Sequence, residues 1–403
     1  MKPDPSRIPA STEVLISGGG PAGSIVAARL AREGRDVLLV EPRAEDEGKV
    51  CGEFLSAEGV PVLERLGLAG RLREAGALPI RRARVAVPGE RSFEATLPAP
   101  GGWTGFSLSR RRLDAALASA AASAGARIVR GARLTRISEP QSGCRTAVIQ
   151  GTGFSRTVRA SLIVGADGRN SAVAAEARIK SPRSASWLGI QLHFARLTAP
   201  PDRVDLLLLE AGYAGLAPIE GDRWCLGALL DPAAIRGSDP VSLLLSRCAP
   251  HSIVGELLRS RRPILERHAV FPVRIGLRRA SAPRILLAGD AACMVDPFSG
   301  QGLALALLGG EAAARTSLMM LARGGGEDAV ARRRYAERIR RLAGSRLAVC
   351  AGLRWLVARP LFFRRLVGLL SANPRAARAV VRLTRGLPAA ADSQSSGHRF
   401  EGG

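Results

Sequence analysis

The stretch TEVLISGGGPAGSIVAARLAREGRDVLLVE, residues 12 to 41, decides the fold. An apolar, β-rich run at 12–17 leads into a glycine-rich turn at 18–23, and a helical run at 24–34 is followed by a second apolar strand at 36–41. A strand, a tight turn, a helix and a strand in this order predict a βαβ unit with two parallel strands.

The turn of this unit carries the spacing GxGxxG, with glycines at Gly18, Gly20 and Gly23. The first glycine permits the turn, the second lets the backbone approach a pyrophosphate, and the third lets helix and strand pack closely. The pyrophosphate would lie at the helix N-terminus, where free N–H groups favour negative charge. Glu41 ends the second strand, where an acid accepts hydrogen bonds from a ribose and disfavours a 2′-phosphate, and hence NADP, at this site. All four residues are predicted to bind a cofactor.

Two further apolar runs, ASLIVGAD at 160–167 and PRILLAGD at 283–290, each end in a turn that contains glycine and aspartate. They predict two more parallel strands, whose carboxyl ends face a ligand crevice. The turns open the motifs GADGRNS (165–171) and GDAACMVDPFSGQG (289–302). Either motif alone fits a turn capped by aspartate, but together with the first glycine motif they indicate one cofactor site.

The three motifs, in this order, resemble the flavoprotein group that contains para-hydroxybenzoate hydroxylase and the geranylgeranyl reductases, over most of residues 12–385. The resemblance implies FAD, bound without a covalent link. It assigns Asp290 to the ribityl and phosphate part of FAD, and it places the loop 297–302 against the isoalloxazine ring. The helix that begins near Gly300 would point its N-terminus at the flavin. The cofactor-binding residues that the resemblance implies are Arg110, Asp167, Gly168, Asp290, Pro297, Gly300, Gln301 and Gly302. Ala174 stands where the second motif of the family usually ends in Arg, so that contact is expected to be lost.

The middle of the chain changes character. Alternating stretches such as LGIQLHFARL and RVDLLLLEAG predict an antiparallel sheet. We therefore expect an α/β fold: an FAD-binding Rossmann-like domain of the glutathione reductase type, an inserted antiparallel β-sheet substrate domain, and C-terminal helices broken at Pro360 and Pro374. The expected ranges are 10–77, 105–180 and 276–325 for the FAD domain, 78–104 and 181–275 for the substrate domain, and 326–390 for the basic helices.

Two segments indicate one subgroup within this flavoprotein group. KVCGEFLS (49–56) and GYAGLAPIEGDRWC (212–225) resemble geranylgeranyl reductases and their bacterial relatives. This implies that Cys51 lies close to the flavin and makes it the one catalytic candidate, although a small buried thiol fits the same pattern. Tyr213 fits either a substrate contact or sheet packing. The four histidines show no companion acid or serine in the sequence, so none is assigned to catalysis.

Composition narrows the function classes. The chain has 403 residues, enough for two domains, and its formal net charge is +24. Residues 331–386 hold fifteen arginines against one acid, Glu337. No aromatic-interleaved basic patch or zinc finger accompanies this charge, so we expect no nucleic-acid partner, while peripheral contact with an anionic membrane stays open. Six scattered cysteines indicate neither disulfides nor a metal site. Without a signal peptide or a membrane-spanning run, a cytoplasmic location is expected, with association at the inner face of the membrane left open.

The resemblance implies NAD(P)H as a transient reductant, in keeping with the absence of a second dinucleotide GxGxxG from the sequence. The first expectation is reduction of a double bond in an apolar isoprenoid or polyketide-like substrate, which the CGE and GYAGLAP segments favour. The alternative is a monooxygenase that hydroxylates an aromatic or polyketide ring, and Gln301 in GQG is more typical of that group. A lipid carrier like the Rab GDP-dissociation inhibitors is a lesser alternative. A halogenase is disfavoured because the WxWxIP signature is missing.

Overall fold

The computed structural model describes residues 5–43, 48–88, 91–195, 197, 199–210, 212–235, 237–252, 254–255, 264–322, 329–357 and 359–385. The predicted βαβ unit is confirmed: β1 (Ser11–Ser17) and β2 (Val37–Glu41) pair in parallel, and α1 (Pro21–Arg32) connects them. Pro21 begins α1, where its missing N–H costs no intrahelical bond.

The FAD-domain sheet has β1 near its centre. From one edge the order is β18 (Ser281–Ala282), β19 (Ile285–Leu287), β11 (Phe154–Gly165), β1, β2 and β8 (Arg127–Arg130), with β10 (Arg145–Gly151) and β9 (Ala132–Ile137) paired beyond β11. The two further parallel strands are confirmed, since β11 pairs in parallel with both β1 and β19. The ends of β1, β11 and β19 therefore meet at one edge, where Ser17 lies opposite Gly165 and Gly165 opposite Leu287.

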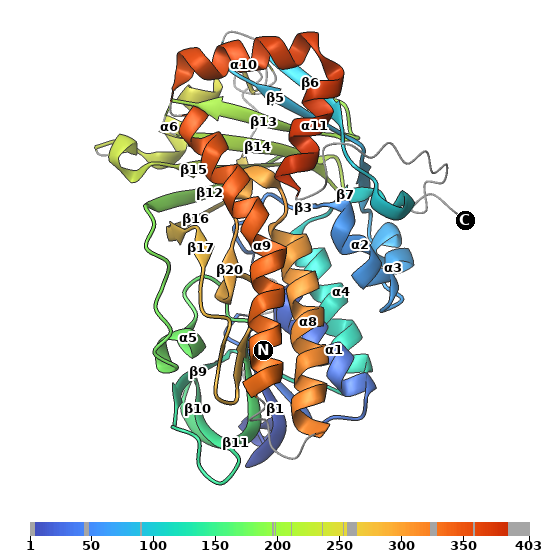
Figure 1. Ribbon diagram of the computed structural model, residues 1–403, viewed down its shortest axis with the longest axis vertical. Helices are drawn as coiled ribbons and strands as arrows, with labels where there is room; N and C mark the ends of the chain where they lie inside the picture. The colour runs from blue at the N-terminus through green and yellow to red at the C-terminus, as the bar shows by residue number, and fades with distance from the viewer. Residues whose placement is uncertain are drawn as a thin grey trace.

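Helices cover this sheet. Figure 1 shows α1, α4 (Arg110–Ser123) and α8 (Gly302–Ala322) side by side, with the long α9 (Ala329–Val357) along α8. The buried core joins the strands to α1 and α8 through residues such as Ile16, Ile25 and Leu307. The remaining short elements are α2 (Val60–Glu64), α3 (Ala69–Glu74), α5 (Ala172–Glu176), β17 (Gly276–Leu277), β20 (Cys293–Met294) and six 3-10 turns at Pro5–Arg7, Ala57–Gly59, Pro100–Gly102, Pro232–Ile235, Gly289–Ala291 and Pro297–Ser299.

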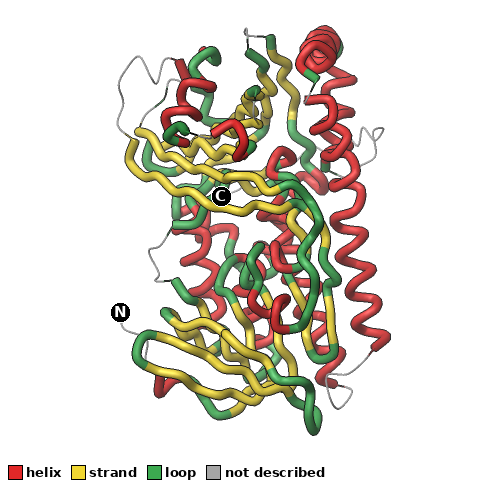
Figure 2. Tube along the Cα trace, turned by 90° about the vertical axis from the view of Figure 1, so that its left-hand side faces the viewer, coloured by secondary structure: helices red, strands yellow, loops and turns green. Residues whose placement is uncertain are grey.

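The second sheet has seven strands. Their order is β16 (Ile264–Arg274), β12 (Ser186–Ala195), β15 (Arg223–Leu230), β14 (Gly212–Ile219), β13 (Arg203–Leu209), β5 (Arg82–Ala86) and β6 (Ser92–Thr96). All neighbours are antiparallel except β13 and β5, which come from segments far apart in the chain. A three-stranded sheet of β3 (Phe54–Leu55), β7 (Gly105–Ser107) and β4 (Leu78–Ile80) lies between the two parts. Figure 2 shows the two large sheets one above the other, with long helices along one side.

The C-terminal helices close the second sheet. The predicted breaks are confirmed, because α10 (Pro360–Ala372) and α11 (Pro374–Thr384) each begin at a proline. Both helices contact β6, and Phe363, Val367 and Leu370 of α10 share a buried cluster with sheet residues. The opposite face of the sheet packs against α6 (Pro240–Cys248). Within the described part of the chain, no helix is both long enough and apolar enough to cross a membrane.

Candidate functional site

The glycine turn after β1 has two different kinds of glycine. Gly18 has φ +102°, and a Cβ there would lie 2.4 Å from the Ala166 carbonyl oxygen; a Cβ on Gly23 would lie 1.9 Å from the oxygen of Gly18. Close backbone packing therefore requires both. Gly20 is different, since the nearest heavy atom to a Cβ there is a guanidinium nitrogen of Arg110 at 3.8 Å. The space in front of Gly20 is open to a ligand.

The Glu41 side chain stabilises the glycine turn through hydrogen bonds to the backbone. Its carboxylate accepts hydrogen bonds from the backbone N–H of Gly19 at 2.6 Å and of Arg43 at 3.0 Å. The predicted position of Glu41 at the end of β2 places it beside the glycine turn, as a ribose-binding acid requires.

One cavity of about 310 Å³ runs from Gly20 to the C-terminal helices. Its first end is polar and contains Lys49, Arg110, Arg169 and Asp290. Burial and the charge of Arg110 lower the pKa of Lys49, although Asp290 acts in the opposite direction. Three cations beside the open space at Gly20 make a donor set that suits a diphosphate, so these residues fit FAD.

Sequence reasoning missed Lys49 and Arg169. Lys49 stands two residues before Cys51, and Arg169 follows Gly168 directly. The sequence did contain a signal for both residues, because Lys49 lies in the segment KVCGEFLS and Arg169 in the motif GADGRNS. Lys49 is also one of only three lysines in an arginine-rich chain.

The two predicted aspartates have different environments. Asp290 lines the cavity. Asp167 instead accepts hydrogen bonds from the Ser171 hydroxyl at 2.6 Å and from the Val173 N–H at 3.1 Å, at the start of α5, and burial raises its pKa. Gly168 lines the cavity, so the second motif meets the ligand space through the backbone of Gly168 and through the side chain of Arg169.

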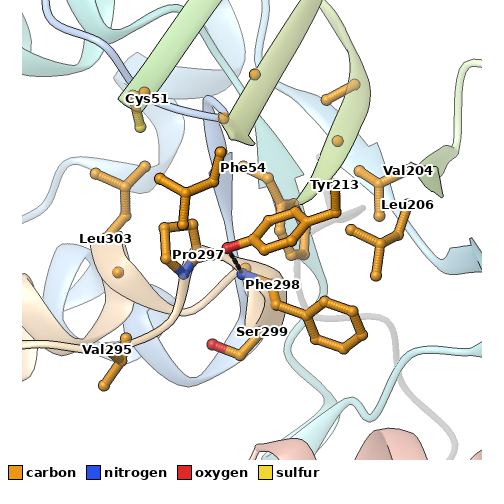
Figure 3. Close-up of a pocket in the computed structure, with 18 of the residues that line it drawn as sticks. Cys51, Phe54, Val204, Leu206, Tyr213, Val295, Pro297, Phe298, Ser299 and Leu303 are labelled. Carbon is orange, nitrogen blue, oxygen red and sulfur yellow. Dashed lines mark hydrogen bonds between the residues drawn. The ribbon is translucent and has the colours of Figure 1, made fainter. Parts of the chain in front are cut away.

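The loop expected to face the flavin is tied to two other elements. Asp296 is fully buried; it accepts a hydrogen bond of 2.5 Å from the Tyr213 hydroxyl of β14 and another of 2.5 Å from Arg354 of α9. The N–H of Phe298 donates to the Tyr213 oxygen at 2.9 Å (Figure 3). Burial, with the charge of Asp296, raises the pKa of Tyr213 well above its ordinary value, so the hydroxyl stays neutral. Tyr213 therefore packs in the sheet, lines the cavity and fixes this loop.

The predicted loop residues divide into two groups. Pro297, Gly300 and Gly302 line the cavity. The Gln301 side chain is buried elsewhere: its amide donates to Glu58 at 3.1 Å and accepts from the Arg346 guanidinium at 3.1 Å. Gln301 thus connects the loop to α9.

Cys51 lies at the junction between the polar end of the cavity and its apolar part. Its sulfur accepts a hydrogen bond from the Glu53 N–H at 3.3 Å, and its carbonyl oxygen accepts one from the Cys225 thiol at 3.4 Å. Burial raises the pKa of Cys51, and the nearby Arg110 charge offsets only part of this effect. The side chain is a thiol at neutral pH, which can give up a proton but is a weak nucleophile.

The prediction that no histidine has an acidic companion was wrong for His268, whose Nε2 lies 3.7 Å from a Glu266 oxygen, and for His193. The Nε2 of His193 lies 2.8 Å from a Glu53 oxygen, and its Nδ1 lies 3.2 Å from a Glu266 oxygen. Both acids are distant from His193 in the sequence, so no linear pattern could reveal them. His251 contacts the Leu208 carbonyl oxygen and not an acid, and His398 lies outside the described residues.

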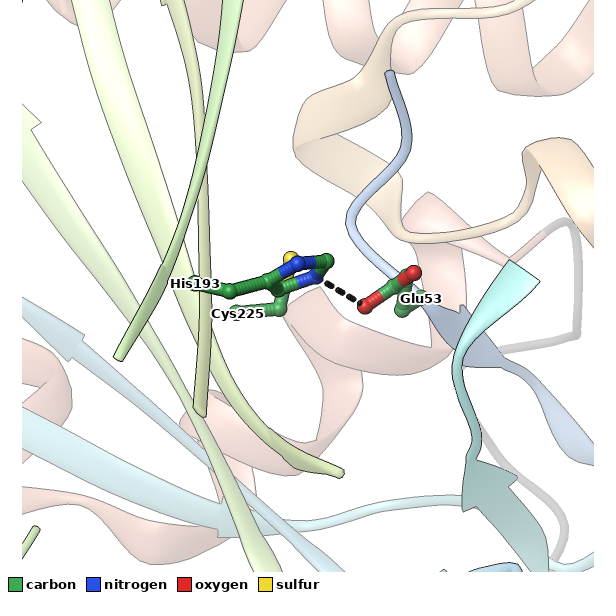
Figure 4. Close-up of side chains that lie close together, drawn as sticks. All are labelled: Glu53, His193 and Cys225. Atoms are coloured by element: carbon green, nitrogen blue, oxygen red, sulfur yellow. Dashed lines mark hydrogen bonds and ion pairs between the residues drawn. The ribbon is translucent and has the colours of Figure 1, made fainter. Parts of the chain in front are cut away.

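Figure 4 shows His193 with Glu53 and Cys225, whose polar atoms all lie within 4.8 Å of one another. The contact of 2.8 Å between His193 and Glu53 is a hydrogen-bond distance. It is shorter than the roughly 3.3 Å that separates two ligands of a tetrahedral zinc ion. Hydrogen bonding accounts for this cluster.

The far part of the cavity is an apolar chamber. Strands β13 and β14 supply Leu206 and Leu216, while α10 supplies Phe363, Leu366 and Leu370. The chamber can hold an apolar molecule whose near end reaches Cys51 and the loop 297–302.

Comparisons with known proteins agree with this geometry. Residues 11–345 match the family model described as an FAD binding domain. The chain is 29% identical over 328 residues to the menaquinone reductase of Mycolicibacterium smegmatis, covering 75% of each protein. It is 29% identical over 350 residues to the digeranylgeranylglycerophospholipid reductase of Methanocella arvoryzae, covering 83% of this chain and 84% of that protein.

The fold is also similar to the crystal structure of a geranylgeranyl bacteriochlorophyll reductase-like protein from Thermoplasma acidophilum. The TM-score is 0.76 at 22% identity, with 90% of this chain and 91% of that one covered. The resemblance and the fold class expected from the motifs are confirmed.

Proposed function

This chain belongs to the FAD-binding domain family of FAD-dependent oxidoreductases, and on that premise we propose that it uses NAD(P)H to reduce a double bond of an apolar, isoprenoid or polyketide-like substrate. The observation that carries the proposal is the single cavity that joins the glycine turn at Gly20 to the apolar chamber beneath α10. The two relatives described above are named a menaquinone reductase and a digeranylgeranylglycerophospholipid reductase.

Each part of the cavity has a role in this proposal. Lys49, Arg110 and Arg169 hold the diphosphate of FAD, and Asp290 accepts hydrogen bonds from its hydroxyl groups. When bound, FAD supplies the hydride that it receives from NAD(P)H. The chamber orients the substrate and excludes water through its apolar walls.

Cys51 is the candidate catalytic residue. Reduction of a double bond adds a hydride to one carbon and a proton to the other. The Cys51 thiol lies where the substrate would approach the cofactor, and its raised pKa keeps a proton on the sulfur at neutral pH. This chain would thus donate the proton from Sγ, and solvent would restore it.

An anaerobic half-reaction tests the proposal. Reduced, FAD-loaded protein is mixed without oxygen with a geranylgeranyl lipid, and with the fully saturated lipid as a control. The yellow absorbance of oxidised flavin should return only with an unsaturated acceptor. Return of the colour only after oxygen is admitted, with oxygen found in the product, would overturn the reductase proposal in favour of the monooxygenase.

We further propose that the protein takes this substrate from an anionic membrane through α10. The exposed side-chain fractions are 58% for Trp355, 63% for Phe362 and 69% for Leu369, although the same region buries Phe363 and Leu370 toward the chamber. A helix that is apolar on both faces needs a second apolar surface.

Positive charge favours a lipid surface as that partner. Arg359 stacks 3.7 Å above the Trp355 ring, and Arg364 and Arg365 are exposed on α10. Each basic residue near an anionic leaflet contributes about 1 kcal/mol. A leaflet that contacts α10 would offer both apolar chains and anionic headgroups.

Sedimentation with phosphatidylserine vesicles tests this contact. The intact chain should sediment at low salt, and the double substitution F362S/L369S should keep it in the supernatant. F271S is the matched control, because Phe271 is 56% exposed on β16, at the opposite edge of the sheet from β6. Equal sedimentation of the double variant and the intact chain would refute the role of α10.

A further inference from the structure

We propose that Glu53 and His193 form a latch that fixes Cys51 beside the cofactor end of the cavity, and that the latch is closed while His193 carries a positive charge. The importance of Cys51 rests on the proposed function, but the latch itself rests on geometry. His193 belongs to the substrate sheet, whereas Glu53 and Cys51 belong to a loop between the FAD-domain elements.

The loop that carries Cys51 has an unusual backbone. Glu53 has φ +53°, in the left-handed region that residues with a Cβ seldom adopt, and it is 3% exposed. Residues 51–53 belong to neither a helix nor a strand. The backbone carbonyl of Glu53 accepts a hydrogen bond from the Leu108 N–H at 3.1 Å, and the contacts of the Glu53 side chain add to this support.

Those contacts are specific. One carboxylate oxygen of Glu53 accepts from the N–H of Arg110 at the start of α4, at 2.9 Å, and the other is bonded to His193 Nε2 at 2.8 Å. The N–H of Glu53 donates to the Cys51 sulfur, and the Cys225 thiol donates to the Cys51 carbonyl oxygen. Glu53 thus binds His193 and also contacts the Cys51 thiol and the first turn of α4.

The geometry favours a charged imidazole, although the Gln191 amide nitrogen also lies 3.3 Å from His193 Nε2. Both ring nitrogens of His193 face carboxylates, those of Glu53 and Glu266, and only the imidazolium has two N–H donors. Burial lowers the pKa of His193, but its hydrogen bonds and charge interactions with the two acids outweigh burial and raise that pKa above its ordinary value.

Other charged and titratable groups surround this pair on every neighbouring element. They are Cys225 and Arg223 of β15, His268 of β16, and Arg110 and Arg111 of α4, with the Gln191 amide on β12 itself. Arg223, Arg111 and His268 face Glu266 and not the ring. The two carboxylates are thus the groups that directly stabilise the charge of His193.

The sign of the pH effect follows. Because the pKa of His193 is raised in the folded protein, the charged latch is fully present below the ordinary pKa of histidine and is lost as the pH rises through the raised pKa. As the pH rises through that pKa, the ring loses one N–H donor and its charge. Glu53 is then a buried carboxylate without a cationic partner, so the left-handed turn and the position of Cys51 are no longer held.

Alkylation of Cys51 measures the latch directly. The rate of reaction with N-ethylmaleimide is followed by peptide mass mapping, in FAD-loaded protein without substrate, for the intact chain and for H193Q. Glutamine keeps an N–H donor but carries no charge. The control is H251Q, since His251 is 3% exposed, close to the 4% of His193, and contacts only a backbone carbonyl oxygen among the acceptors described.

At pH 6 we expect H193Q to react at least tenfold faster than the intact chain, with H251Q unchanged. The two rates should converge as the pH rises and the intact latch opens. If H193Q does not fold, the isosteric E53Q variant makes the same comparison. Equal rates at pH 6, or a ratio that does not change with pH, would overturn the latch. Because no substrate is used, a failure of turnover would remove the reductase proposal and leave this result standing.

Discussion

The substitution of Gly20 by valine separates cofactor binding from folding. Gly20 has φ −73° and ψ −174°, an extended conformation that valine adopts readily. The nearest heavy atom to its new Cβ is 3.8 Å away, so the side chain enters open space. The free energy of unfolding of the apo-protein should change by less than about 1 kcal/mol, as at an ordinary surface site.

The effect on FAD should be much larger. In the proposed binding mode the valine side chain would occupy the space through which the backbone approaches the diphosphate of FAD. If two backbone hydrogen bonds to this charged group are lost, at about 1.5–3 kcal/mol each, binding weakens by roughly 3 kcal/mol or more. Since 1.4 kcal/mol corresponds to a factor of ten, the dissociation constant should rise by at least about a hundredfold.

Two matched variants define the comparison. In G23V the Cβ would lie 1.9 Å from the Gly18 oxygen, so this change should destabilise the apo-protein itself. In G70V the Cβ meets no atom within 4 Å, in α3, and neither FAD binding nor the turn should suffer. Titration of apo-protein with FAD gives affinity, and thermal unfolding gives stability. If G20V binds FAD with an affinity within threefold of that of the intact chain, Gly20 has no role in binding the diphosphate. If the Tm of G20V falls as far as that of G23V, the variant has misfolded.

Further outcomes follow from the other site residues. D290A should weaken FAD binding more than D167A, because Asp290 lines the cavity while Asp167 caps α5; equal affinities in apo-protein titrations would contradict this ranking. D167A should instead lower the Tm, since the Ser171 hydroxyl and the Val173 N–H lose their acceptor. C51A should change the rate or the product of turnover while FAD content stays near normal; steady-state kinetics identical to those of the intact chain would make Cys51 a packing residue only.

Local patterns made much of the fold predictable. The GxGxxG motif occupies the six residues 18–23 between β1 and α1, and the prolines at Pro360 and Pro374 each begin a helix, so short windows of sequence were sufficient. Parallel pairing of β1, β11 and β19 followed from three similar strand ends.

Contacts between distant segments were not predictable in this way. Glu53 and His193 are separated by 140 positions in the sequence. They meet because the fold places β12 next to the loop that contains Cys51. Gln301 matched a motif, but motif matching cannot tell that its side chain turns toward Glu58 and Arg346 while its neighbours line the cavity. The direction of a side chain depends on the elements that pack around it, and a single sequence does not contain that information.

The mass of the product after turnover distinguishes reduction of a double bond from hydroxylation. The FAD-loaded protein is supplied with NADH or NADPH and an unsaturated isoprenoid lipid under strictly anaerobic conditions, and the product is identified by mass spectrometry. A reductase should give a product that has gained two hydrogens, with the same yield when oxygen is present or absent. A product that forms only with oxygen and has gained one oxygen atom would contradict the reductase proposal.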